Sequence, residues 1–207
     1  MNKILLFIGL LLYSNSSYSQ YMVEIKTKFQ NNSYYIIARG TKSKQHYIGT
    51  RFNTINDSIT HIGIGLSISS VLKIYNVNPV KGANAFEVES FESFINESDL
   101  CYYGIWKLEL ETNESDILKS VIEKLDTAGI RFDFDFKISS DFQKLYCSEF
   151  VWMLLKSVNE IYNFKPISKD TKLLGLSGIL KRDVLVYIPV DFFLAFNNLT
   201  FIESWAK

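Results

Sequence analysis

Alternating apolar and polar positions predict several strands, most of them in the first half of the chain. Residues 60–69 alternate strictly, with aliphatic side chains on one face and His61, two glycines and two serines on the other. This period of two is typical of a strand with two unlike faces. The same reasoning predicts further strands at residues 21–29, 34–38, 71–78, 105–110, 132–136 and 184–188.

Apolar residues spaced three and four apart predict two substantial helices. Residues 148–162 carry such a stripe, which is typical of a helix with one buried face. Residues 113–128 form the second, with Asn113 as a plausible N-cap and Gly129 as the stop signal. A closing helix is expected after Pro189. Strands in runs with a few helices to one side predict an α+β fold.

Composition limits the class of protein. The chain has 207 residues, enough for one well-packed domain, and 47% of them are apolar, which excludes a disordered chain. Lys plus Arg and Asp plus Glu balance at 22 each, and no basic run stands out. The whole-chain charge therefore gives no electrostatic support for a nucleic-acid partner or for an anionic membrane.

The first nineteen residues resemble an export signal. Lys3 is followed by an apolar run over residues 4–12, and residues 17–19 have the small–x–small form of a cleavage site. We expect cleavage after residue 19, which leaves residues 20–207 as a single exported domain in the periplasm or outside the cell. An uncleaved anchor is the alternative. No later apolar stretch is long enough to span a bilayer, so no transmembrane segment is expected after cleavage.

Export makes the two cysteines informative. An oxidising compartment would allow Cys101 and Cys147 to pair in a disulfide. A domain of this size does not need such a bond, so one cysteine can instead be kept for its chemistry.

Cys147 stands at the expected start of the helix over residues 148–162. Free backbone amides and the helix dipole favour an anion there, which would lower the pKa of a thiol and promote nucleophilic attack. The same amides could hold the oxyanion of a tetrahedral intermediate. The alternative interpretation is a buried structural cysteine.

His61 and Asn76 are the candidate partners of this thiol. Glycines on the His61 face would let another element approach, and the helix that begins near Cys147 is expected to pack there. The alternative is that these glycines mark a bulge. Asn76 lies on the face of its strand that is expected to turn inward, where the His61 imidazole is a candidate partner, unless Asn76 is partly exposed. His46, the other histidine, lies in a polar loop.

The sequence has no motif for metal binding, phosphate binding or a serine nucleophile. The two histidines and two cysteines show no metal-ligand spacing. Neither a glycine-rich phosphate loop nor a Gly-x-Ser-x-Gly motif occurs. No metal and no cofactor are therefore expected.

Several motifs together resemble a known family. Thr60-His61-Ile62-Gly63-Ile64 resembles the "S/T-H-x-G-I" strand of the permuted NlpC-like cysteine hydrolases of the YaeF/YiiX type. Residues 132–136 and 145–151 resemble the "YDxxF … YCSELV" segment of that family, and residues 187–192 its "I-x-P-x-D" close. The histidine precedes the cysteine, which is the permuted order, and the similarity extends from about residue 48 to residue 202.

The resemblance implies a papain-like α+β fold, with an antiparallel sheet or small barrel packed against the cysteine-bearing helix. It implies Cys147 as nucleophile, His61 as general base and Asn76 as the third polar residue, with Tyr146 and Glu149 supporting the site. The implied activity is cleavage of an amide bond, in a peptide or a cell-wall peptide, through an acyl-enzyme. A binding module of the same fold, or a lipid or acyl ester hydrolase or acyltransferase, is the alternative.

Overall fold

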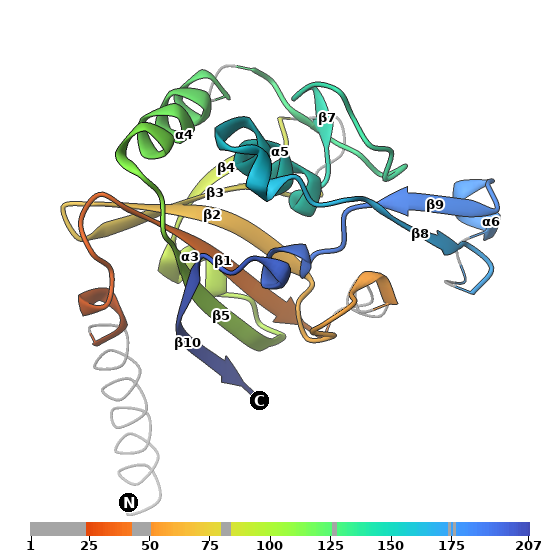
Figure 1. Ribbon diagram of the computed structural model, residues 1–207. Helices are drawn as coiled ribbons and strands as arrows, with labels where there is room; N and C mark the ends of the chain where they lie inside the picture. Colours follow the sequence, from red (N-terminus) through yellow and green to blue (C-terminus); the bar gives the residue numbers. More distant parts are fainter. Residues whose placement is uncertain (1–23, 43–50, 80–83, 126–127, 174, 176) are drawn as a thin grey trace, which may run out of the picture.

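The computed structural model describes residues 24–42, 51–79, 84–125, 128–173, 175 and 177–207 (Figure 1). The predicted signal segment, residues 1–19, lies outside the described residues, as does His46. Among the helices that are described, none is long and apolar enough to cross a membrane.

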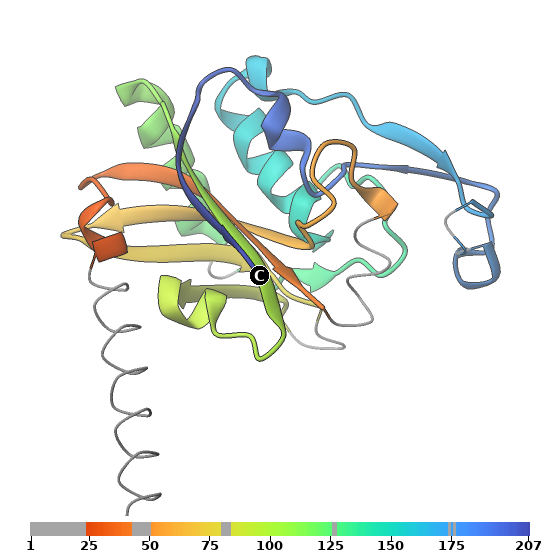
Figure 2. The ribbon, with the colours of Figure 1, turned by 90° about the horizontal axis from the view of Figure 1, so that it is seen from below.

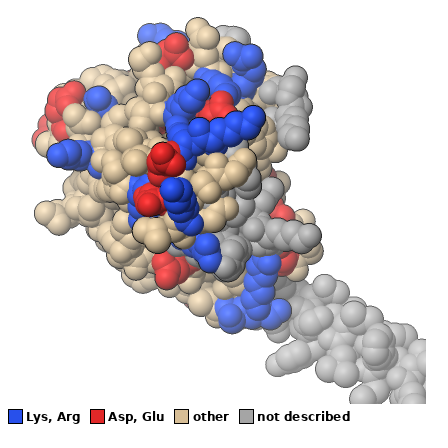
Figure 3. Space-filling model, turned by 90° about the vertical axis from the view of Figure 1, so that its right-hand side faces the viewer, with Lys and Arg blue, Asp and Glu red and all other residues tan. Residues whose placement is uncertain are grey.

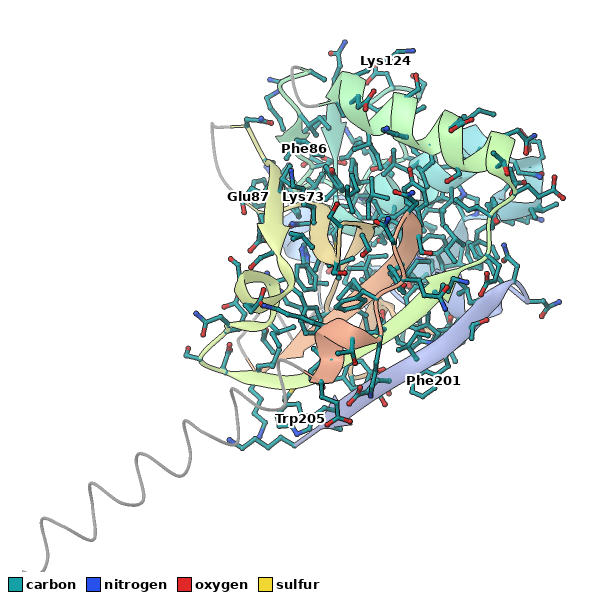
Figure 4. The ribbon with its side chains drawn as sticks, turned by 90° about the vertical axis from the view of Figure 1, so that its left-hand side faces the viewer. Lys73, Phe86, Glu87, Lys124, Phe201 and Trp205 are labelled. Atoms are coloured by element: carbon teal, nitrogen blue, oxygen red, sulfur yellow. The ribbon has the colours of Figure 1, made fainter. Side chains whose placement is uncertain are left out.

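A six-stranded antiparallel sheet forms the centre of the molecule, in the order β10-β5-β1-β2-β3-β4. Figure 4 shows its two edges, with Phe201 and Trp205 on β10 and with Phe86 and Glu87 on β4. The strands are β1 (Ser33–Thr41), β2 (His61–Ile68), β3 (Val71–Val77), β4 (Phe86–Ser90), β5 (Leu100–Leu108) and β10 (Leu199–Ala206).

The other elements lie around this sheet. The helices are α3 (Phe91–Ile95), α4 (Thr112–Leu125), α5 (Cys147–Val158) and α6 (Ser177–Leu180), with 3₁₀ turns at Glu160–Tyr162 and Phe192–Ala195. Two small sheets pair β6 (Arg131–Phe132) with β7 (Lys144–Leu145), and β8 (Ile167–Asp170) with β9 (Val184–Tyr187). The predicted α+β class is confirmed, since a large antiparallel sheet is accompanied by few helices.

The two faces of the central sheet belong to two separate cores. Ile62 and Ile64 of β2 face the larger core, together with Phe150 and Leu154 of α5. Ile74 of β3 and its same-face neighbours join the smaller core, which contains α3 and the chain before β1. Figure 2 shows α5 and α3 on opposite sides of the sheet. The alternation predicted for β2 explains why its two faces belong to different cores, because it presents aliphatic side chains to one core only.

Four expected elements differ from the structure. Residues 24–27 form a helical turn where a strand was predicted. Ile25 and Phe29, four positions apart, are both buried in the smaller core, and this spacing suits a helical turn. The predicted closing helix is only a 3₁₀ turn, followed by the unpredicted strand β10.

The segment over residues 132–136 is mostly a turn, not a strand. Only Arg131 and Phe132 pair with β7. The Asp133 carboxylate then accepts hydrogen bonds from the backbone amides of Asp135, at 3.0 Å, and Lys137, at 2.6 Å. An aspartate that binds backbone amides ahead of it favours a turn, and here this outweighs the alternating pattern.

The cysteine-bearing helix is shorter than predicted. α5 begins at Cys147, one residue earlier than expected, and ends at Val158. Asn159 then accepts a hydrogen bond from the Ile161 amide at 3.1 Å and starts the 3₁₀ turn that contains Tyr162. Asn159 therefore closes α5 with its backbone amide, which donates to the Leu155 carbonyl oxygen, and caps the 3₁₀ turn with its side chain.

Candidate functional site

A hydrogen-bonded chain of three side chains runs from β2 across β3 to β4. Nε2 of His61 lies 3.1 Å from Oδ1 of Asn76, and both residues are buried. Nδ2 of Asn76 donates in turn to Oε1 of Glu89 at 2.9 Å. The predicted contact between His61 and Asn76 is therefore confirmed, and Glu89 extends it.

This chain defines which ring nitrogen of His61 carries the proton. The Glu89 carboxylate can only accept, so the Asn76 amide must turn its NH₂ group toward Glu89 and its carbonyl oxygen toward His61. That oxygen accepts from Nε2, which therefore carries hydrogen. Nδ1 of a neutral ring is then left with a lone pair, as a general base requires.

Glu89 is itself held by further donors. Its Oε2 accepts from Oγ of Ser93 at 3.0 Å, and its Oε1 lies 3.5 Å from Nδ2 of Asn78. Sequence reasoning did not single out Glu89. The alternation of residues 86–90 carries a usable signal, because it predicts a strand with Glu87 and Glu89 on one face, and the structure pairs Glu89 with Ile74 of β3.

Gly63 makes the approach of Asn76 to His61 possible. A Cβ atom at Gly63 would lie 2.7 Å from Cγ2 of Ile74 and 3.1 Å from Cβ of Asn76. The glycines on this face therefore make room for side chains of β3, the neighbouring strand. The expectation that the Cys147 helix packs against them is wrong, because α5 packs on the opposite, aliphatic face of β2.

Cys147 nevertheless reaches the strand that carries His61. The backbone amides of Ile62, Ser148 and Cys147 itself act on its thiol and lower its pKa, and Ile62 is the residue that follows His61 in β2. Burial raises the pKa of the thiol to about 11, although these amides and the Arg39 charge act in the opposite direction. The expected lowering is therefore wrong for this buried arrangement. Among the described residues, no hydrogen bond joins this sulfur to the His61 ring.

Arg39 is a charged neighbour of both groups. It lies opposite His61 in the pairing of β1 with β2. Its guanidinium donates to the carbonyl oxygen of Phe94 at 2.5 Å, pairs with Glu97 at 3.1 Å and stacks over the Phe94 ring. Burial, together with the Arg39 charge, lowers the pKa of His61 to about 3, so the ring is neutral at physiological pH.

The chain after β9 holds the start of α5. The hydroxyl of Tyr146 accepts a hydrogen bond from the Ile188 amide at 2.8 Å. Oγ of Ser148 donates to the Ile188 carbonyl oxygen, also at 2.8 Å. Tyr146 thus supports the position of Cys147 through the backbone of Ile188.

The same segment also holds the loop that precedes β2. The buried Asp191 carboxylate accepts hydrogen bonds from the backbone amides of Thr54, at 2.8 Å, Asn56, at 2.9 Å, and Ile55 between them. Residues 188–191 therefore connect the cysteine helix to the loop leading to His61. The spacing of the sequence motif gave no indication of this contact.

Glu149 is a buried acid in the first turn of α5. One carboxyl oxygen accepts from the Ser139 amide, and the other has no partner among the described residues. Burial, with a smaller contribution from the nearby charge of Asp133, raises the pKa of Glu149 to about 7. Glu149 thus holds the 133–141 loop against the helix that carries the thiol.

The remaining expectations concern the cysteines and metals. Cys101 and Cys147 are both free thiols, so the disulfide considered above is not formed. Within the described part of the chain, no group of three or more His, Cys, Asp and Glu residues is placed to hold a metal ion.

Comparison with known proteins identifies a shared fold. No protein-family model matches the chain, and no curated protein matches its sequence. The structure is similar to that of the metalloprotein yiiX from Escherichia coli O157:H7, with a TM-score of 0.59 and 16% sequence identity. The match covers 86% of this chain and 100% of that chain. The chain therefore has a YiiX-like α+β fold, in agreement with the predicted family type.

Proposed function

We propose that the protein is an exported thiol hydrolase of the permuted papain-like type, which cleaves an amide bond through an acyl-enzyme on Cys147. The observation that carries this proposal is the hydrogen bond that orients the His61 ring. Asn76 holds its Nε2–H, so Nδ1 keeps a lone pair, and the backbone amide of Ile62, the next residue along the strand, acts on the Cys147 thiol. A thiol, a base and an orienting amide are the parts that acyl transfer requires.

The proposed reaction uses these groups in order. Nδ1 of His61 takes the thiol proton, and the sulfur attacks the substrate carbonyl carbon. The C–N bond then breaks, the leaving amine takes the proton back from His61, and the acyl group stays on sulfur as a thioester. Water hydrolyses this thioester with His61 again as the base, which frees the acid and restores the thiol. Arg39 favours the thiolate in the first step, because its charge lowers the pKa of Cys147.

The buried state of both groups means that the described arrangement is a resting one. The thiol and the ring are both neutral in it, and no hydrogen bond joins them. Substrate binding must bring the ring to the sulfur before the proton moves.

A binding module of the same fold is the second candidate. The burial that raises the pKa of Cys147 and lowers that of His61 favours it, because an inert pair would have these properties. In this case Cys147 is only a packing residue of the larger core.

Labelling with a peptidyl electrophile separates the two candidates. We expect the folded protein to be labelled at Cys147, with labelling abolished in Cys147→Ala and strongly slowed in His61→Ala. Cys101→Ala is the matched control, since it removes the other free thiol and should be labelled normally. Equal labelling of Cys147→Ala, or labelling of Cys147 only after denaturation, would refute the hydrolase and support the binding module.

A further inference from the structure

The hairpin formed by β8 and β9 projects from the body of the molecule and carries α6 at its end (Figures 1 and 2). Side chains from both halves of the hairpin tie it to the body. Nζ of Lys169 donates to the carbonyl oxygens of Arg51, at 2.8 Å, and Asn53, at 3.3 Å. Arg182 donates to the carbonyl oxygens of Asp135 and Phe136. A Cβ atom built at Gly175 would lie 3.5 Å from Nη1 of Arg51, so the hairpin is tied to the body at several points along its length.

Three described aliphatic side chains near the end of this hairpin are exposed. Residues 173–180 contain no charged residue in the sequence. Leu173 is 80% exposed, and Val184 and Val186, on the outward face of β9, are 54% and 44% exposed. Large aliphatic side chains on a projecting tip lose contact with water only when another surface covers them.

The flanks of the tip are basic, although the chain as a whole is neutral. Residues 165–186 contain five Lys or Arg and two Asp residues, while the full chain has 22 of each sign. Lys172 and Lys181, which directly border the apolar stretch, are exposed. Figure 3, which views the molecule from the side of the hairpin, shows Lys and Arg gathered on this face with acidic side chains between them. The whole-chain balance thus conceals a local excess of three positive charges.

We propose that this hairpin end is an interfacial membrane-binding element, with an anionic lipid bilayer as its partner. Apolar side chains bordered by Lys and Arg match the headgroup region and the acyl boundary of a bilayer. The aliphatic side chains enter the acyl boundary, while the cations bind lipid phosphates. Charge complementarity selects this partner over a second copy of the chain, because two basic hairpins repel each other. The inference does not depend on the chemistry of Cys147.

Membrane binding would also orient the candidate site. β9 ends at Tyr187, and the next residue, Ile188, makes the hydrogen bonds that hold Tyr146 and Ser148 at the start of α5. The hairpin tip is therefore linked through β9 and Ile188 to the helix start that carries Cys147.

A fluorescent reporter placed in the tip tests the proposal on the full chain. Leu173→Trp should show a blue-shifted emission with phosphatidylglycerol vesicles, and brominated lipids should quench it, after subtraction of the parent spectrum. The local reporter separates the hairpin from the apolar residues 4–12, which remain in both proteins. Ile161→Trp, at a position that is 64% exposed, is the matched control and should show neither effect.

Charge variants complete the test. Lys172→Glu combined with Lys181→Glu should weaken partitioning of the reporter protein roughly tenfold or more, and high salt should have a similar effect. Cys147→Ala should bind normally. An unshifted Leu173→Trp emission, an equal shift in phosphatidylcholine vesicles, or a shift that instead follows self-association in sedimentation would overturn the proposal.

Discussion

The two faces of β2 are different environments, although they belong to the same eight residues. The aliphatic face packs against α5 in the larger core, and the start of that helix carries the thiol. The glycine-containing face adjoins the smaller core, and at its end the imidazole is bonded to the Asn76 amide, which is bonded in turn to the Glu89 carboxylate. One strand thus separates the candidate nucleophile from the group that orients its base. The two environments adjoin at residues 61 and 62, because the Ile62 amide acts on the Cys147 thiol while His61 is bonded to Asn76.

Large aromatic deletions should have the largest effects and should distinguish the two cores. Phe150 in α5 and Phe94 in α3 are both fully buried, so replacing either with Ala should lower the free energy of unfolding by about 3–5 kcal/mol. Chemical denaturation measures this loss, and a value below about 1 kcal/mol would contradict the core assignment. Only the Phe94 change should also raise the pKa of His61, whose ring lies 5.6 Å from it. The milder Phe94→Leu allows this titration to be followed by NMR.

The two faces should also respond to pH in opposite directions. Burial raises the pKa of Glu149 from 4.5 to about 7, so the stability this acid contributes is complete below pH 4.5 and is lost as the pH rises to 7. Glu149→Gln should remove this loss. The free energy of unfolding of the variant, relative to that of the parent protein, should therefore be roughly 3 kcal/mol higher at pH 8 than at pH 4.

His61 should show the reverse dependence. Its pKa is lowered from 6.5 to about 3, so its stability contribution is complete above pH 6.5 and is lost as the pH falls toward 3. His61→Gln should therefore reduce the pH dependence of the free energy of unfolding only on the acidic side. Urea unfolding from pH 4 to pH 9 measures both variants, and identical profiles for the two would contradict the assignment.

A methyl group at Gly63 should disturb the glycine-containing face alone. Gly63→Ala should cost about 1–3 kcal/mol, because its Cβ would crowd Ile74 and Asn76. Gly178→Ala is the control, since no atom lies within 4 Å of a Cβ built there. If thermal denaturation shows equal stability for both variants, close packing of β3 against β2 is not the reason for the glycine.

The smallest expected effect concerns the orientation of the ring. Asn76→Ala should slow alkylation of Cys147 by iodoacetamide about tenfold, which corresponds to about 1.4 kcal/mol, because the tautomer of His61 is no longer defined. Asn78→Ala is matched to it, since Asn78 also contacts Glu89 but is not bonded to His61. Equal rates for the two variants would remove Asn76 from the proposed mechanism.

The sequence predicted local elements better than it predicted which surfaces meet. The alternation of residues 60–69 gave β2 correctly, and the inward face of β3 gave the contact between Asn76 and His61. The packing of α5 was placed on the wrong face, because glycines make room for a neighbouring strand as readily as for a helix.

The apolar and polar pattern of the sequence also did not predict contacts between distant segments. The hydrogen bonds of Asp191 span more than 130 residues, and the strand β10 is defined by its partner β5. Neither has a local periodicity that could reveal it. The roles of Cys147, His61 and Asn76 in catalysis stay predictions, and so does the export signal.

The short segment at residues 188–191 has a consequence for the timing of assembly. It follows both α5 and β2 in the chain, yet it contacts the start of the helix and the loop before the strand. During synthesis, therefore, the thiol and the imidazole can each be present in a nascent chain well before anything holds them in register. The pair is held in place only after this later segment has been synthesised, which delays a reactive site until the domain around it can fold.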